Sequence, residues 1–273
     1  MISFLYGTVL GRSILKMVLK LHIDRMIVRF LWSPWSRTLV GWYIRRNQIP
    51  IDRQQMKGFC SFQQFFVRER KRNAVDLRPD HLISPCDSWM TSVPLGGDQS
   101  FFIKGSCYHL EDLIGDSKIA ERFRGGICLI FRLTASDYHH YCYIDDGYQG
   151  AIHFMPGVLH SVQPVACETY PVYTLNRRCW CLMTTEHFGP VIQTEIGALV
   201  VGNICNEREN CRFCRGEEKG HSELAGSTIV QFFEPNRIRL LPEYEQVAKT
   251  GQEVRVEQGK WIGNREVHAF PVL

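Results

Sequence analysis

The residue types that could do chemistry lie in three separated segments of the 273-residue chain. Ser227 follows Gly226 and opens the apolar run STIVQFF. A serine hydroxyl beside a base is a nucleophile, and a glycine leaves its own carbonyl open to approach because it has no side chain. Asp87 ends the run SPCD, and His139 stands in the polar run DYHH. Carboxylates and histidines in such places can hold or move protons near neutral pH.

Each of these residues also fits a structural role. Ser227 fits a turn that leads into a strand, and Asp87 fits a turn after a proline. His139 and its polar neighbours fit a structural cluster. The residue types alone therefore do not show whether these residues are catalytic. The order of the motifs around them gives further information.

Eleven cysteines are spread from Cys60 to Cys214, and no secretory signal with a small-residue cleavage site is visible. The odd number and the scatter favour free thiols in a reducing cytosol over a disulfide framework. Cys211 and Cys214 form a C-x2-C pair, with Cys205 and His221 nearby, and four such ligands would suit structural zinc. Because a second pair is missing, we expect no metal and keep zinc as an alternative.

Residues 1–72 hold fourteen Lys and Arg against three acids, although the whole chain has a net charge of only +4. Basic residues recur every four positions from Arg12 to Lys20 and from Arg25 to Arg29, which predicts basic amphipathic helices. Tryptophans, which favour membrane interfaces, follow at 32, 35 and 42. We expect residues 1–58 to lie on an anionic membrane surface. Packing on the protein's own core is the alternative, and nucleic acid is not expected because aliphatic residues alternate with the basic ones.

The remainder, residues 59–273, is expected to form one β-rich domain. A short helix is predicted at 61–70, and long helices are not expected after about residue 125. Short runs rich in β-branched and aromatic residues, bounded by turn residues, predict strands. The predicted strands are 126–133, 158–162, 180–184, 191–195, 198–204 and 227–233. The fold class is therefore α+β: amphipathic helices followed by a mainly antiparallel barrel or sandwich.

Short motifs occur in a fixed order along this domain. They read FFVR at 65–68, SPCD at 84–87, FRLTASDYH at 131–139, PGVLHSV at 156–162, VGNI at 201–204 and KGHSELAGST at 219–228. In this order they resemble the phosphatidylserine decarboxylase family, over roughly residues 59–235. Ser88 stands where the family pattern has a glycine, His221 and Ser222 stand where it has an aromatic pair, and Cys142 stands where it has a second histidine.

The resemblance implies a proenzyme that cuts itself between Gly226 and Ser227 into chains 1–226 and 227–273, which stay together as a heterodimer. Ser227 would become a pyruvoyl group, a covalent cofactor made from the protein itself. Such a group forms a Schiff base with phosphatidylserine and accepts the electrons left when CO2 departs, which gives phosphatidylethanolamine in phospholipid biosynthesis.

The resemblance also implies roles for individual side chains. Asp87 belongs to the relay of self-processing, and His139 matches the histidine tied to decarboxylation. The base of self-cleavage stays open between Cys142, His140 and His139.

A lipid substrate and a basic N-terminal region together predict a peripheral protein at the cytoplasmic face of the cell membrane. Two other functions stay open: a pyruvoyl-dependent decarboxylase of a soluble amino acid, and a non-catalytic, zinc-stabilised membrane adaptor. Self-cleavage would argue against the adaptor. Activity that survives loss of residues 1–50 would argue for a soluble substrate.

Overall fold

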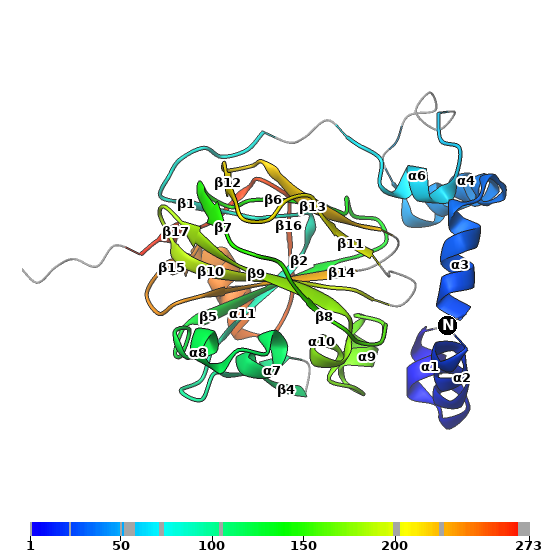
Figure 1. Ribbon diagram of the computed structural model, residues 1–273, viewed down its shortest axis with the longest axis horizontal. Helices are drawn as coiled ribbons and strands as arrows, with labels where there is room; N and C mark the ends of the chain where they lie inside the picture. Colours follow the sequence, from blue (N-terminus) through cyan, green and yellow to red (C-terminus); the bar gives the residue numbers. More distant parts are fainter. Residues whose placement is uncertain are drawn as a thin grey trace, which may run out of the picture.

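The computed structural model describes residues 2–21, 23–49, 51, 58–70, 74–103, 106–198, 203–223 and 227–266. Gly226, and the segment 199–202 of the predicted strand 198–204, lie outside these residues. A helical N-terminal region stands beside a β-rich body (Figure 1). This arrangement confirms the α+β class.

The N-terminal region consists of α1 (Ile2–Gly7), α2 (Val9–Lys20), α3 (Ile23–Trp32), a 3-10 turn (Pro34–Ser36) and α4 (Arg37–Asn47). Leu31 of α3 and Val40 and Ile44 of α4 form an apolar cluster with the phenylalanines of α6 (Phe62–Phe66). The predicted helix 61–70 is thus shorter than expected, and Ser61 caps its start by accepting a hydrogen bond from the backbone N–H of Gln64. Among the described helices, none has the length and apolar character needed to cross a bilayer.

The body is built around a nine-stranded antiparallel sheet. Its main path runs β12 (Cys211–Phe213), β7 (Gly147–Gln149), β9 (Arg178–Thr185), β10 (Gly189–Ile196), β14 (Ser227–Phe233), β5 (Ile127–Leu133), β2 (Ser88–Pro94) and β16 (Val254–Val256), with β8 (His153–Met155) also on β9. The described strands form open sheets and not the closed barrel that was one of the two expected forms. A sheet of this size twists, so its two ends need not meet.

Three smaller antiparallel sheets complete the body. They are β11 (Asn203–Asn206) with β13 (Glu218–Glu223) and β6 (His140–Cys142); β1 (His81–Ile83) with β17 (Trp261–Arg265) and β15 (Ile238–Leu240); and β3 (Ser100–Ile103) with β4 (Ser106–His109). Five short helices connect them, namely α7 (Leu110–Ile114), α8 (Ser117–Glu121), α9 (Pro164–Cys167), α10 (Val172–Leu175) and α11 (Pro242–Lys249).

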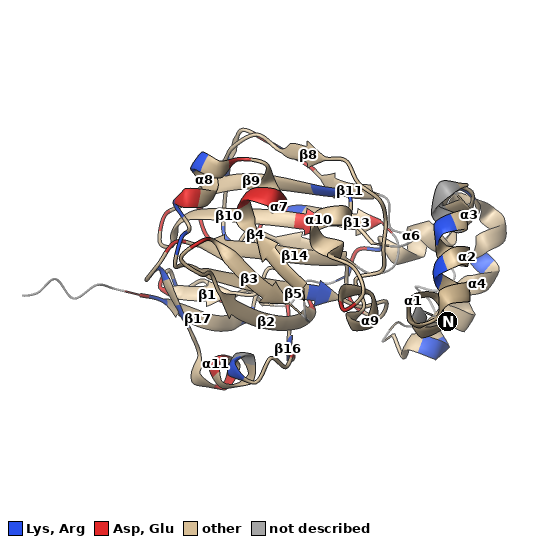
Figure 2. Cartoon of the chain, turned by 90° about the horizontal axis from the view of Figure 1, so that it is seen from below, with Lys and Arg blue, Asp and Glu red and all other residues tan. Residues whose placement is uncertain are grey.

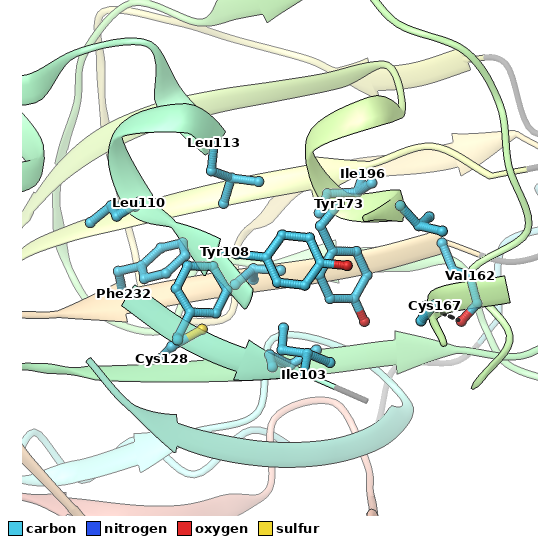
Figure 3. Packing of buried hydrophobic residues seen from close by; sticks show 14 of the residues in the cluster. Ile103, Tyr108, Leu110, Leu113, Cys128, Val162, Cys167, Tyr173, Ile196 and Phe232 are labelled. Carbon is cyan, nitrogen blue, oxygen red and sulfur yellow. Dashed lines mark hydrogen bonds between the residues drawn. The ribbon is translucent and has the colours of Figure 1, made fainter. Parts of the chain in front are cut away.

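The strand that begins at Ser227 is buried along its whole length. Its alternate residues enter two different apolar clusters, because successive side chains of a strand point to opposite faces. Val230 and Phe232 belong to the cluster that contains Tyr108, part of which is drawn in Figure 3, whereas Ile229 and Phe233 belong to the other cluster. This two-sided burial explains why the run STIVQFF is apolar without alternation, and it fixes the first residue of the strand rigidly.

One predicted strand, 158–162, is wrong. Val158 makes an isolated bridge to Asn176, and the segment continues without strand pairing. Leu159 and Val162 are nevertheless buried. Periodicity cannot separate a segment buried by packing from one buried by pairing, and Pro164 starts a helix directly afterwards.

Candidate active site

Ser227 is the first residue of β14, where it pairs with Leu133 of β5. It is only 5% exposed. Its Oγ lies 2.9 Å from Oγ of Ser222, on β13. Ser222 is also buried, and its backbone N–H donates to the carbonyl of His139 at 3.0 Å. Two hydroxyls and a histidine are therefore neighbours where β13 runs beside β6.

The imidazole of His139 completes a chain of hydrogen bonds. Its Nδ1 lies 3.2 Å from Oγ of Ser222, and its Nε2 lies 2.9 Å from the backbone carbonyl oxygen of Thr134. A carbonyl oxygen can only accept, so Nε2 must carry the proton. In neutral His139 the lone pair is then on Nδ1 and faces Ser222, which donates to it.

The turn before His139 holds this carbonyl in place. Oδ2 of Asp137 accepts from the backbone N–H of Thr134 at 2.6 Å and from its hydroxyl at 2.8 Å. The backbone N–H of Asp137 donates to the Thr134 carbonyl at 3.0 Å. Arg255 pairs with the other carboxylate oxygen of Asp137 at 2.6 Å. Asp137 thus orients the group that sets the tautomer of His139, in the manner of the third member of a catalytic triad.

His139 is an uncharged base at neutral pH. Burial lowers its pKa to about 4, an effect that the hydrogen bond to Thr134 and the charge of Asp137 oppose and that nearby Arg68 adds to. The ring of Phe66, from α6, lies 4.5 Å from the imidazole. The short helix therefore helps to keep water away from the histidine.

Asp87 lies in a different set of contacts. Its two oxygens pair with the guanidinium of Arg70 at 2.5 and 2.9 Å, and Oδ1 accepts from the backbone N–H of Gln258 at 2.9 Å. The guanidinium of Arg70 also lies over the ring of Tyr138, 4.3 Å from its centroid. The described contacts of Asp87 are thus those of an ion pair, and none of them reaches Ser227 or His139.

The described contacts of His140 and Cys142 are with other groups. Nδ1 of His140 lies 2.5 Å from Oε1 of Glu218, and its Nε2 lies 3.1 Å from the carbonyl of Val67. Cys142 is buried, and its backbone N–H donates to Pro85 at 2.9 Å. The described hydrogen bonds therefore join His139 to Ser227 through Ser222, whereas those of His140 lead to Glu218 and Val67.

The zinc alternative also depends on this region. Within the described residues, possible metal ligands converge in two groups: His140, Glu218 and His221, and Cys205, His221 and Glu223. Neither contains Cys211 or Cys214, so the four expected ligands are not assembled. In the first group both nitrogens of His140 are already hydrogen-bonded, to Glu218 and to the carbonyl of Val67.

A cavity of about 720 Å³ opens beside Asp87, between α6 and the body. Three arginines and three acids line it, together with Tyr138; they are Arg68, Arg70, Arg255, Glu69, Asp87 and Glu257. Arg68 also donates to the carbonyl of Phe65 at 3.2 Å. The cavity thus lies close to the site and offers guanidinium groups to an anion.

Sequence reasoning missed four contributors to the site: Ser222, Asp137, the carbonyl of Thr134 and Arg68. The departure of Ser222 from an aromatic position is the one sequence signal that could have marked it. A backbone carbonyl leaves no signal in a sequence.

A buried serine hydroxyl joined through a second serine to a neutral histidine is the arrangement typical of a class, that of proteins with a serine nucleophile. More narrowly, the chain belongs to the phosphatidylserine decarboxylase family, whose sequence profile matches residues 61–260. Similar curated proteins are "Phosphatidylserine decarboxylase proenzyme 2" of Clostridium acetobutylicum, 35% identical over 265 residues, and "Phosphatidylserine decarboxylase proenzyme" of Clostridium perfringens, 31% identical over 272 residues. The first alignment covers 96% of this chain and 91% of the relative, and the second covers 97% and 92%.

Proposed function

We propose that the chain is a phosphatidylserine decarboxylase proenzyme that cuts itself before Ser227 and converts this serine into a pyruvoyl group. The observation that carries the proposal is the buried hydroxyl of Ser227 at the head of a fixed core strand, joined through Ser222 to His139. Membership of the family and relatives that carry the word proenzyme in their names support it.

The covalent chemistry balances with water as the only added reactant. Oγ of Ser227 attacks the carbonyl carbon of Gly226, the C–N bond breaks, and the amine takes a proton, which leaves an ester. Loss of the α-hydrogen of residue 227 and cleavage of its Cβ–O bond release a carboxylate at Gly226 and leave dehydroalanine. Its imine tautomer reacts with one water to give ammonia and the pyruvoyl group.

The residues present fit such a group. Before cleavage, Ser227 is buried and its hydroxyl is hydrogen-bonded to Ser222. A pyruvoyl group at this position would supply a carbonyl that accepts the electrons left by CO2. His139, shielded by Phe66, would pass a proton to the α-carbon of the substrate only after its Nδ1 has first taken one up, because the neutral ring carries its proton on Nε2. Asp87 would act indirectly, by holding Arg70 at the edge of the cavity.

The two products of cleavage would stay together. β14 lies in the middle of the main sheet, with β10 on one side and β5 on the other. Seven consecutive residues, Ser227 to Phe233, are paired with β5. Chain 227–273 would therefore remain hydrogen-bonded to chain 1–226 as a heterodimer.

The cavity suits the head group of the lipid. Phosphatidylserine carries a phosphate and a carboxylate, and guanidinium groups bind both. Arg70 and Arg255 each have a carboxylate partner, Asp87 and Asp137, whereas the described side-chain contacts of Arg68 are with Phe65. We assign the anion of the head group to Arg68.

The N-terminal region would bring the site to the lipid. Eleven of the eighteen large apolar side chains that the described structure exposes lie in its first 42 residues, among them Trp32, Trp35 and Trp42. Basic residues lie on α2 and α3 in the same region (Figure 2). Apolar and basic side chains together favour the surface of an anionic membrane. We place the protein there peripherally, with residues 1–58 as the membrane-associating region, and on the cytoplasmic face because all eleven cysteines are free thiols.

Intact-mass spectrometry of purified protein tests the proposal. The expected result is two chains, with the short one, 227–273, beginning in a pyruvoyl group, and release of CO2 from phosphatidylserine in vesicles but not from free serine. Ser227→Ala should give one uncut chain. A wild-type protein that stays uncut would overturn the proposal, and release of CO2 from free serine would favour the soluble-substrate alternative.

A further inference from the structure

We propose that Ser222 is the proton relay of self-cleavage and that His139, reached through it, is the base. The inference rests on the proposed self-cleavage and names the groups that drive it. Ser222 replaces an aromatic residue of the family pattern, and Cys142 replaces the second histidine. This chain would therefore carry a proton path of its own.

The direction of each hydrogen bond follows from the backbone. Nε2 of His139 donates to the Thr134 carbonyl, so Nδ1 can only accept. The single proton of Ser222 is then used toward Nδ1, at 3.2 Å. The oxygen of Ser222 therefore accepts a hydrogen bond from the hydroxyl of Ser227, whose Oγ lies 2.9 Å away. The proton of Ser227 therefore lies between its own Oγ and that of Ser222.

The relay is held by main-chain contacts and not by chance rotamers. The backbone N–H of Ser222 bonds to the carbonyl of His139 at 3.0 Å, so the two residues are fixed side by side. β13 pairs with β6 at His221, which precedes Ser222, and at His140, which follows His139. Burial of Ser222 and Ser227 excludes bulk water from the path.

Proton transfer along this path balances in one step. As Oγ of Ser227 forms its bond to the carbonyl carbon before it, its proton moves to Oγ of Ser222. The proton of Ser222 moves to Nδ1 of His139, which becomes an imidazolium with both nitrogens protonated. The imidazolium then gives its Nδ1 proton back to Oγ of Ser222, Ser222 passes a proton to the departing amine nitrogen, and His139 is neutral again.

The other candidates are placed less well. Both nitrogens of His140 are occupied, by Glu218 and by the carbonyl of Val67. Adjacent residues of an extended chain point to opposite faces, so a histidine at 140 cannot take the place of its neighbour. Cys142 lies two residues further along, where its strand is paired to Glu218.

The test compares Ser222→Thr with Ser222→Val in cell-free synthesis, with the full chain followed from its release to its conversion into chains 1–226 and 227–273. Thr and Val have nearly the same shape, so both strain the buried site alike and only Thr keeps the hydroxyl. A general base typically contributes 10²- to 10⁴-fold. We expect the Ser222→Thr chain to be cut about a hundredfold faster than the Ser222→Val chain. A ratio of at least tenfold is what the relay requires. A difference of less than tenfold overturns the relay.

Two further measurements separate the relay from misfolding and from the other base. The ¹⁵N shifts of His139 in the uncut Ser227→Ala chain should show the proton on Nε2, and a proton on Nδ1 would overturn the inference. Cys142→Ala tests the rival base: cleavage within a few-fold of wild type supports the relay, and loss of cleavage in a chain that still unfolds cooperatively overturns it. If wild type itself is not cut, the proposed function fails; if wild type is cut and Ser222→Val is cut equally fast, the relay alone fails.

Discussion

Two adjacent histidines divide the site into two regions of opposite character. His139 lies in a closed region with Ser222 and Ser227, where burial keeps it neutral. His140 lies toward Glu218 and Tyr138, beside a cavity lined with arginines and acids. The first region is suited to move a proton and the second to bind an anion. The difference teaches that residues next to each other in a motif can serve separate steps, because an extended chain sends them to opposite faces.

The sharpest way to break this comparison is to remove each histidine in turn. His139→Ala should slow self-cleavage by about 10²- to 10⁴-fold, since it removes the base. His140→Ala should slow it only a few-fold, because His140 has no hydrogen bond to Ser222 among its described contacts. Time courses of chain conversion measure both. Equal losses would show that the two regions act as one.

The ion pair of the second region should matter more for stability than for cleavage. Asp87→Asn removes the charged partner of Arg70 at a position where Asp87 is nearly buried. We expect the free energy of unfolding to fall by about 1–3 kcal/mol. Urea unfolding of the uncut Ser227→Ala chain measures this cost. Glu245→Gln is the matched control, because the Glu245–Lys249 pair is exposed and should contribute less than about 1 kcal/mol. A loss no larger than that of the control would contradict the structural importance of the pair.

Arg68 links the two regions, since it lines the cavity and also disfavours the charged form of His139. Arg68→Gln should raise the KM for phosphatidylserine vesicles about tenfold, the effect of roughly 1.4 kcal/mol of lost binding. Arg122→Gln, in an exposed ion pair with Glu234, is the control. An unchanged KM would remove Arg68 from the head-group site.

Membrane contact should depend on the N-terminal region alone. Trp35 is 81% exposed, and Trp35→Ser should weaken binding to anionic vesicles a few-fold to about tenfold, because one aromatic anchor is lost. Tyr148→Ser changes an exposed aromatic residue of the β-rich body and should have no effect. Sedimentation with vesicles measures both. Equal binding by the two variants would argue that the N-terminal surface packs elsewhere.

The smallest effect is expected from a change of pH on the rate of self-cleavage. A small effect is what a buried, neutral His139 predicts. A histidine with an ordinary pKa near 6.5 loses half its activity as a base at that pH. His139, with its pKa lowered to about 4, stays neutral, so cleavage should change less than about twofold between pH 6 and 8. A rate that halves near pH 6.5 would contradict the closed character of this region.

The same shift affects folding stability with a definite sign. The unfolded chain protonates His139 near pH 6.5, whereas the folded chain does so only near pH 4. The unfolded state therefore binds more protons between these values, and stability falls as the pH is lowered through this window. The full contribution is present above about pH 6.5. Urea unfolding at pH 7 and pH 5, compared between the uncut chain and its His139→Gln variant, isolates the effect.

Much of the molecule could be predicted from short-range patterns. The helical spacing of charges after Arg12 and the apolar run from Ser227 to Phe233 both correspond to elements of the structure. The run at 158–162 could not be assigned, because its burial comes from packing against distant residues. Asp87 was recognised as important, but its partner Arg70 lies 17 residues away and no periodic pattern connects them.

By itself, the sequence determined the α+β class, the basic apolar N-terminus and the serine that we propose as the nucleophile, because each is encoded in residues that are neighbours along the chain. Only the tertiary structure decided which histidine reaches Ser227 and through which group. That choice depends on the pairing of β13 with β6, which brings Ser222 to His139, and on the carbonyl of Thr134, which sets the tautomer. Each depends on a main-chain group, one between two strands and one in the turn before His139, and residue types alone do not specify them.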